Sequence, residues 1–344
     1  MKNCVSGKQT KLGAIALLAL LSIYSCSHDN EITVDQNAKT EEKVVVANRV
    51  GSSVTFIDAV TNTVTKTLTI ANSDPMYVVY VPKTDRLYVG DRANKKIHII
   101  NPQNQQIETS VNVGNGVFHM WADAQGKELW VVNDIDKTIS VVNLATNSVT
   151  NTISVDMTPH DIFLSQDGTT AYVSVFTSSS TSDKIYKYST STYAKTGEKT
   201  VGKEPHLFYA NNKLYVPCQL EKTYILDGNT LNTLSEKVFT GAHGIFMLPS
   251  QNIFFVSNIT GNQLYSINAT TGDQIGSLVS SSAATPHNIV LNDKGDKMFV
   301  THSGGTANTV SIYNVNSSGT ISPSATATVG TNPFGLTCYK RELK

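Results

Sequence analysis

The sequence predicts an all-β fold, a seven-bladed β-propeller with four-stranded blades. A short phrase recurs seven times, and the residues between its copies read as four short strands separated by polar turns. The two ends of the chain also supply complementary parts of one blade. Counted at their third residues, successive copies lie 43, 41, 46, 37, 44 and 47 positions apart. A period of this size indicates stacked supersecondary units rather than one conventional core.

Each copy of the phrase opens an apolar first strand, as at residues 162–164, and a turn such as Asp167-Gly168 follows. A second apolar strand comes next, as at residues 129–133, and then an alternating third strand, as at residues 140–143. A polar hairpin leads to the fourth strand. Four short strands in about 43 residues are typical of a propeller blade.

The two ends of the chain complete the count. The last copy of the phrase begins a single first strand through residue 339, where the repeat stops. Residues 43–48, 53–58 and 63–70 read as second, third and fourth strands without a first strand before them. We therefore expect a composite blade from the N- and C-terminal segments, which closes the ring and removes open sheet edges.

The second strands carry a family resemblance. They include Tyr88-Val89-Gly90-Asp91, Trp130-Val131-Val132-Asn133 and Tyr172-Val173-Ser174. This block resembles the YVTN-type β-propellers over roughly residues 43–340. The resemblance implies the propeller fold and says little about activity, because the architecture hosts unrelated functions.

The first 25 residues are typical of a targeting segment. Three lysines precede an apolar run from residue 12 to 24, and Ser25-Cys26 follows. The run is too short for a spanning helix, which needs about 20 apolar residues. The segment resembles a lipoprotein signal in the looser form found in Bacteroidetes. It implies lipid attachment at Cys26, an acidic tether over residues 26–42, a propeller over 43–344 and an outer-membrane location, on the periplasmic or the surface side.

Charge and cysteine content limit the classes of binding partner and the number of disulfides that we expect. Without residues 1–25 the chain has 24 basic and 27 acidic side chains and no basic tract, so nucleic acid is not an expected partner. Three cysteines then remain, and with Cys26 lipidated at most one disulfide can form. We expect a monomer attached to a membrane by its lipid.

Histidines supply the clearest chemical signal. Five copies of the phrase end in histidine at the third position, whereas Met76 and Phe334 end the other two. In a blade, the entry to the first strand and the exit from the second lie on the same face. The sequence therefore predicts an arc of histidines on one rim, joined by one at a second-strand end: His119, His160, His206, His243, His287 and His302.

Converging imidazoles suit a transition metal, and an all-histidine arc favours copper. The arrangement is loosely similar to the propeller domain of nitrous oxide reductase. Asp161 and Asp91 are candidates to orient the imidazoles. Other interpretations stay open. Gene duplication can copy a histidine with a structural role around the ring as readily as a histidine that binds a ligand. Cys218 is either a buried structural thiol or a soft metal ligand, and Trp121 either packs in the core or forms the wall of a ligand pocket.

Three classes of function remain at this point. The first is a metal-binding propeller that supports oxidoreductase chemistry with an electron-transfer partner. The second is a surface module that captures a small ligand, such as a corrinoid or porphyrin, or a protein. The third is an enzyme of the propeller lactonase or lyase kind, in which histidines and carboxylates perform acid–base chemistry. No phosphate loop, nucleophile elbow or metalloprotease helix motif is present in the sequence.

Overall fold

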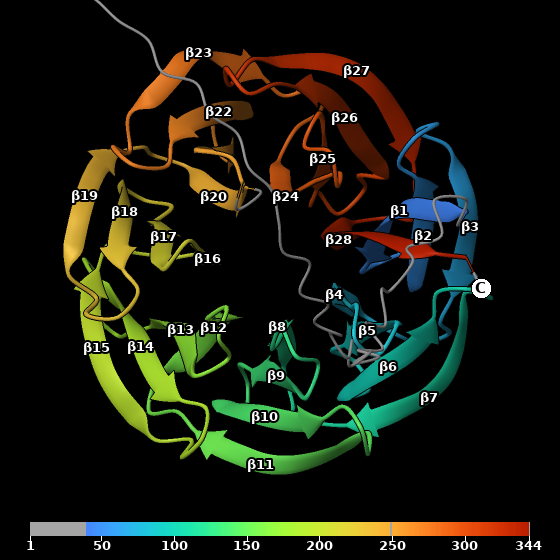
Figure 1. The fold of residues 1–344 in the computed structure, drawn as a ribbon, viewed down its shortest axis with the longest axis horizontal. Helices are drawn as coiled ribbons and strands as arrows, with labels where there is room; N and C mark the ends of the chain where they lie inside the picture. The colour runs from blue at the N-terminus through green and yellow to red at the C-terminus, as the bar shows by residue number, and fades with distance from the viewer. Residues whose placement is uncertain (1–38, 248–249, 344) are drawn as a thin grey trace, which may run out of the picture. The chain divides into compact units, whose positions relative to one another are not determined.

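The computed structural model describes residues 39–247 and 250–343, which form a ring of seven four-stranded antiparallel sheets (Figure 1). In each sheet the strands run outward from the ring centre in the order of the repeat. No helix occurs among these residues, so none there could cross a membrane. The predicted all-β, seven-bladed propeller is confirmed. The predicted signal segment and Cys26 lie outside the described residues.

The strands of each blade are given from the centre outward. Blade 1 comprises β28 (Pro333–Glu342), β1 (Thr40–Asn48), β2 (Ser53–Asp58) and β3 (Val64–Thr69). Blade 2 comprises β4 (Pro75–Val81), β5 (Arg86–Asp91), β6 (Lys96–Asn101) and β7 (Gln106–Asn112). Blade 3 comprises β8 (Val117–Ala122), β9 (Glu128–Asn133), β10 (Thr138–Asn143) and β11 (Ser148–Ser154). Blade 4 comprises β12 (Thr158–Leu164), β13 (Thr170–Phe176), β14 (Asp183–Ser189) and β15 (Lys195–Val201). Blade 5 comprises β16 (Phe208–Ala210), β17 (Lys213–Pro217), β18 (Lys222–Asp227) and β19 (Thr233–Val238). Blade 6 comprises β20 (Ala242–Phe246), β21 (Ile253–Asn258), β22 (Gln263–Asn268) and β23 (Gln274–Ser280). Blade 7 comprises β24 (Pro286–Leu291), β25 (Lys297–His302), β26 (Thr309–Val315) and β27 (Ile321–Thr328).

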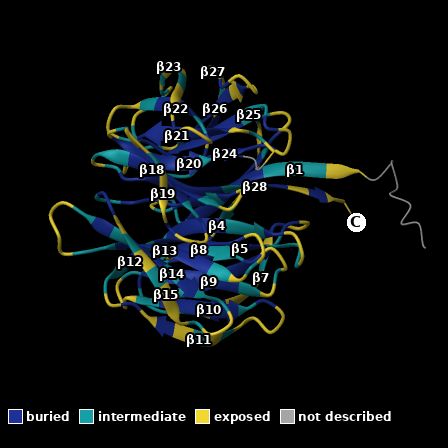
Figure 2. Cartoon of the chain, turned by 60° about the vertical axis from the view of Figure 1, so that its left-hand side comes forward, coloured by how far each residue is buried: buried dark blue, intermediate teal, exposed yellow. Residues whose placement is uncertain are grey.

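Burial explains the composition of the strands. Second and third strands such as β9 and β10 are packed on both faces by neighbouring blades and are almost wholly buried. Their sequences are accordingly rich in valine and isoleucine. Fourth strands such as β7 form the outer wall, where most residues are exposed, and as a group they are rich in threonine and serine (Figure 2).

Blade 1 closes the ring, as the sequence predicts. The C-terminal strand β28 pairs antiparallel with β1, with Lys43 opposite Tyr339 and Val45 opposite Thr337. Strand β1 begins at Thr40, so its first three residues belong to the propeller rather than to the predicted tether. The buried guanidinium of Arg341 joins Asp85 of blade 2 at 2.9 and 3.0 Å and Glu41 of β1 at 3.0 Å.

A β-bulge recurs at the start of the first strand and positions the site described below. Two residues of the first strand face one residue of the second, as where Met76 and Tyr77 lie opposite Gly90. The same register shift occurs in every blade except blade 5, where Pro205 bridges Cys218 and Phe208 pairs with Tyr215 in unbroken register. A bulge brings two successive side chains toward one place. We call them the first and second bulge residues.

The ion pairs of Arg341 should stabilise ring closure. Arg341→Ala removes the guanidinium that pairs with two partly buried carboxylates, of which Glu41 keeps its ion pair with Lys43, so the free energy of unfolding should fall by roughly 2–4 kcal/mol. Lys340→Ala is the matched control, because its ion pair with Asp293 is exposed and should contribute under about 1 kcal/mol. Denaturant unfolding of both variants checks this. Equal stability losses would contradict a closing role for Arg341.

Candidate functional site

A closed girdle of side chains surrounds the propeller axis at the entry to the first strands. It consists of the first bulge residues and of His206, which takes that place in blade 5: Met76, Phe118, His160, His206, His243, His287 and Phe334. Neighbouring rings are in contact. Ring centroids are 4.9 Å apart for His160 and His206, 3.7 Å for His206 and His243, and 4.3 Å for His243 and His287. Phe118 and Phe334 flank the four histidines at 4.5 and 4.1 Å.

The structure corrects the predicted position of His119. Val117 pairs with Asn133 as Pro159 pairs with Val175, so Phe118 and not His119 corresponds to His160. His119 is a second bulge residue. A signal for this was present in the sequence. Val117 lies 12 residues before Leu129 of the second strand, just as Pro75 lies 12 residues before Leu87. Val117 therefore corresponds to Pro75. The alignment of the recurring phrase instead placed Phe118 opposite Pro75, one residue out of register.

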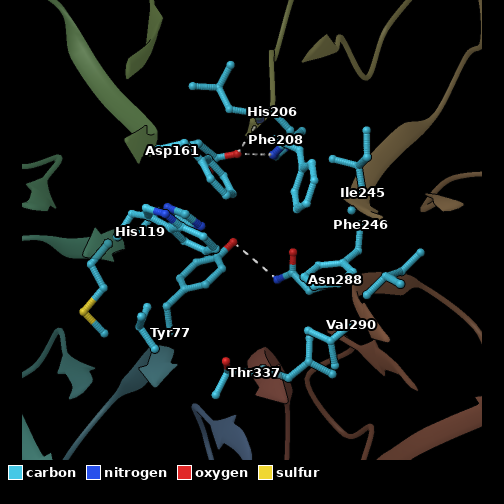
Figure 3. Close-up of a pocket in the computed structure, with 18 of the residues that line it drawn as sticks. Tyr77, His119, Asp161, His206, Phe208, Ile245, Phe246, Asn288, Val290 and Thr337 are labelled. Atoms are coloured by element: carbon cyan, nitrogen blue, oxygen red, sulfur yellow. Dashed lines mark hydrogen bonds and ion pairs between the residues drawn. The ribbon is translucent and has the colours of Figure 1, made fainter. Parts of the chain in front are cut away.

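A second layer of side chains lies directly behind the girdle. Of the second bulge residues, Tyr77, His119, Asp161 and Asn288 project toward the axis (Figure 3). The other two are Gly244 and Gly335. A Cβ on either glycine would collide with the backbone of the next blade, at His287 or at Met76. Four polar side chains therefore face one another across the channel.

These side chains line a cavity of about 80 Å³. Its far side is a second ring of residues, one from the first strand of each blade, which we call the floor ring: Val79, Trp121, Phe163, Phe208, Phe246, Val290 and Thr337. The aromatic members are packed, with Trp121 and Phe163 4.3 Å apart. The cavity is small compared with the roughly 300–1,000 Å³ of pockets for drug-sized ligands.

Asp161 is the centre of the polar cluster. Its Oδ2 accepts a hydrogen bond from Nδ1 of His206 at 3.2 Å and another from the amide of Leu207 at 3.1 Å. Its Oδ1 lies 3.1 Å from Nδ1 of His160, at ion-pair distance but without hydrogen-bond alignment. One donor atom from each of His160, Asp161 and His206 lies within 4.8 Å of the others. A carboxylate thus lies between two imidazoles from adjacent blades.

Electrostatics keep this carboxylate ionised and most of the imidazoles neutral. Burial alone would raise the pKa of Asp161, but His160 and His206 hold it well below its usual value. Burial lowers the pKa of His206, although Asp161 opposes the shift. Burial and two neighbouring imidazoles lower the pKa of His243 well below the ordinary value. Burial also lowers the pKa of His119 to about 4 and that of His287 to about 3.

The remaining polar atoms are partly paired. Asn288 donates from Nδ2 to the hydroxyl of Tyr77 at 3.3 Å (Figure 3). The same Nδ2 also donates to Nδ1 of His287 at 2.8 Å. The amide of Ile162 donates to Nδ1 of His119 at 3.2 Å. Three buried polar atoms of the described residues lack a hydrogen bond here: Nδ1 of His160, Oδ1 of Asp161 and Nδ1 of His243. Unpaired buried polar atoms are costly, so their concentration at one place points to a ligand.

His302 is not part of this cluster. Its Nδ1 lies 2.9 Å from the carbonyl of Ala284 and its Nε2 2.8 Å from Oγ of Ser311. The same bond from the end of the second strand to the third strand recurs in other blades: Asn48–Thr55, Asp91–His98, Asn133–Ser140 and Asn258–Tyr265. Both ring nitrogens of His302 are thus engaged within its own blade, which favours a structural role over the predicted one as a ligand.

The same network explains Asp91, which binds His98 rather than orienting the girdle. His98 also contacts Oγ of Ser110 at 2.8 Å, so Ser110, His98 and Asp91 resemble a catalytic triad in composition. Because Asp91 and His98 form the repeated interstrand bond, we assign them a structural role. Cys218 is wholly buried and its pKa is raised by burial, as expected of a structural thiol. Trp121 lines the cavity as part of the floor ring.

Comparison with known proteins supports the fold. No family model and no curated protein matches the chain. A chain of Kuenenia stuttgartiensis hydrazine synthase aligns with a TM-score of 0.70 at 14% identity, over 80% of this chain and 93% of that one. The periplasmic gluconolactonase PpgL of Pseudomonas aeruginosa aligns with a TM-score of 0.70 at 16% identity, over 87% and 99%. The dihydro-heme d1 dehydrogenase NirN, in complex with DHE, aligns with a TM-score of 0.62 at 11% identity, over 86% and 74%.

These identities are low, so the likeness is one of fold. The three neighbours carry different activities on one architecture, which means that the site must be interpreted from its own residues.

Burial of a neutral imidazole should make stability depend on pH. His119 has an ordinary pKa of 6.5 when unfolded and about 4 when folded, so the unfolded chain binds its proton first. The contribution of His119 is therefore full above pH 6.5 and declines as the pH falls toward 4, by roughly 3 kcal/mol. Denaturant unfolding at graded pH, with a chelator present, measures this decline.

His119→Gln is the matched variant, because glutamine can still accept from the amide of Ile162 but does not titrate. Its stability should fall less steeply over the same pH range. The lowered pKa of Asp161 gives a contribution to stability that is present above pH 3.8 and is lost only below it, outside this window. Identical slopes for the variant and the wild type would mean that His119 is not buried as a neutral imidazole.

Proposed function

We propose that the protein binds one divalent first-row transition metal ion through His160, Asp161 and His206. One observation carries the proposal: donor atoms of these three residues converge from blades 4 and 5 at a buried place next to the cavity. A tetrahedral ion with bonds of about 2.0–2.1 Å holds its ligands about 3.3 Å apart. Here one ligand atom from each residue lies within 4.8 Å of the others, and Nδ1 of His160 and Nδ1 of His206 lie 3.1 and 3.2 Å from Oδ1 and Oδ2 of Asp161, respectively.

The charge of the cluster also supports a cation. Asp161 is buried and ionised, while His206, His243, His287 and His119 have depressed pKa values and are neutral near pH 7. A buried negative charge without a full positive partner is unfavourable. A divalent ion would offset it, and His243, with an unpaired Nδ1, is the nearest additional ligand candidate.

The donor set bears on the identity of the metal. An arc made of histidines alone favours copper. The carboxylate makes the set two imidazoles and one oxygen, which is typical of zinc in hydrolytic sites and of non-haem iron(II). Copper(II) still binds such ligands tightly, so we retain it as the third candidate.

Metal binding can be measured directly. The purified propeller should take up one ion of zinc, iron(II) or copper near pH 7, with a rise in melting temperature that grows with free metal concentration. Asp161→Asn keeps the shape of the side chain but removes its charge. It should weaken binding at least about tenfold, as expected when one ligand is lost. Calorimetric titration and elemental analysis after dialysis give both quantities.

The matched control is His302→Asn, because asparagine stands at the corresponding place in Asn48, Asn133 and Asn258. That variant should bind metal like the wild type. Because His206 has a lowered pKa, binding should also persist somewhat below pH 6.5 before protons displace the metal. Absence of uptake, or equal losses in the two variants, would overturn the metal site.

A lactonase-like hydrolase is the second candidate. The observation that favours it is the Asp161–His206 pair beside the cavity, since a carboxylate-bound imidazole can act as a general base. A corrinoid or porphyrin is disfavoured, because a cavity of about 80 Å³ cannot enclose a tetrapyrrole. Hydrolysis of glucono-δ-lactone, followed by acid release, tests this function. Turnover by the wild type that is lost in Asp161→Asn would support it, and equal rates with and without protein would refute it.

We also propose that the propeller is held at the cell envelope by lipid on Cys26, as the N-terminal sequence indicates. Cys26→Ser in the full chain should move the protein from the membrane fraction to the soluble fraction. Cys4→Ser, in the same segment, should leave the distribution unchanged. Membrane retention of the Cys26 variant would contradict the anchor.

A further inference from the structure

A second pocket, of about 380 Å³, lies beyond the floor ring. The first strands of blades 2 to 5 run past that ring to the turns that lead to their second strands, and the pocket is lined by these strand ends. Val79, Trp121 and Thr337 border both the pocket and the histidine cavity. The pocket is therefore the opposite mouth of the same channel.

The two mouths differ in access. At the histidine mouth the girdle is packed: His206, His243 and His287 are buried, and the ring of Phe176 stacks on His160 at 4.5 Å. The second pocket is within the roughly 300–1,000 Å³ that organic ligands occupy. An organic molecule thus has room at this mouth and not at the girdle.

The lining of the pocket is aromatic and held in place by packing. Tyr80 stacks on Tyr339 at 4.7 Å, and Tyr209 stacks on Tyr172 at 5.4 Å with 17° between the ring planes. The indole of Trp121 is partly exposed and packs on Phe163. Rings that are already oriented lose little entropy when a flat ligand stacks on them.

The lining also carries no net attraction for a charged ligand. Among the described residues that line the pocket there is no lysine or arginine, and the only carboxylate is that of Asp123. That carboxylate is buried and accepts hydrogen bonds from the amides of Gln125, Lys127 and Glu128 at 2.8, 2.9 and 2.5 Å. A charged ligand would lose its hydration here without gaining a partner.

We propose that this pocket is a binding site for a neutral organic molecule with a flat ring system, bound between Trp121, Tyr80 and Tyr209. The assignment rests on the size, shape and charge of the pocket and is independent of metal at Asp161. The floor ring separates the two compartments, so a bound molecule would contact Trp121 on the side opposite to His119, which lies 6.5 Å from the indole and parallel to it.

N-phenyl-1-naphthylamine, which is neutral, and 8-anilinonaphthalene-1-sulfonate, its anionic relative, form a matched pair of probes. The neutral probe should bind the purified propeller and accept fluorescence energy from Trp121, while the sulfonate should bind at least about tenfold more weakly. Tyr209→Ala should weaken the neutral probe about tenfold. Tyr193→Ala is the control, because Tyr193 is also partly buried but packs against Trp130 outside the pocket.

Ala124→Glu gives a second variant that carries little risk for folding, since Ala124 is exposed at the pocket rim. The longer side chain should narrow the pocket mouth, and its carboxylate would have to lose hydration beside a bound apolar ring, so binding of the neutral probe should weaken while the melting temperature stays unchanged. The proposal is supported if the neutral probe binds the wild type and binds more weakly to the Tyr209 and Ala124 variants but not to the Tyr193 variant. No binding, equal affinity for the sulfonate, or equal loss in Tyr193→Ala would overturn it. Binding of the probe does not depend on metal at Asp161. The titration therefore tests this proposal even if the protein binds no metal there.

Discussion

The β-bulge at the start of the first strand is the constraint on which the candidate site depends. A regular strand directs successive side chains to opposite faces, so it could present either His160 or Asp161 to the axis but not both. The bulge aligns two residues against one of the second strand and brings both to the channel. Its extra amide is satisfied locally, since the amide of Asp161 donates to Oγ of Ser174 and that of Asn288 to Oγ1 of Thr301. Blade 5 lacks the bulge, and there the single residue His206 reaches Asp161 from the neighbouring blade.

The chemistry of the site follows from one carboxylate among imidazoles that burial keeps neutral. Four histidines in contact could not all be charged, because like charges in a poorly solvated place repel strongly. Asp161 forms a hydrogen bond with only one neighbouring imidazole, that of His206, which leaves Nδ1 of His160 and Nδ1 of His243 without a hydrogen bond. Two of the three proposed ligands, Asp161 and His206, are therefore held in the protonation states that bind metal. The same burial that favours a cation reduces stability in acid.

The sequence predicts the fold almost completely and the site in part. Strand patterns and the repeat period are local signals, so blade number, strand order and the composite blade could be predicted. The girdle histidines of blades 4 to 7 follow from their shared position. His119 was misassigned because Val117 replaces the proline that marks the phrase. The pairing of Asp161 with His206 could not be derived, because it joins residues 45 positions apart across two blades. His302 resembles a rim ligand in sequence, and only its hydrogen bonds to Ala284 and Ser311 reveal a structural role.

The most direct test of this account is anomalous diffraction from crystals of the propeller soaked in zinc and measured across the zinc absorption edge. The account predicts one strong peak within about 2.3 Å of an oxygen of Asp161 and of ring nitrogens of His160 and His206. That peak should be absent from crystals of Asp161→Asn. A zinc-loaded crystal with no peak at Asp161, or with its peak at the surface only, would contradict the central claim.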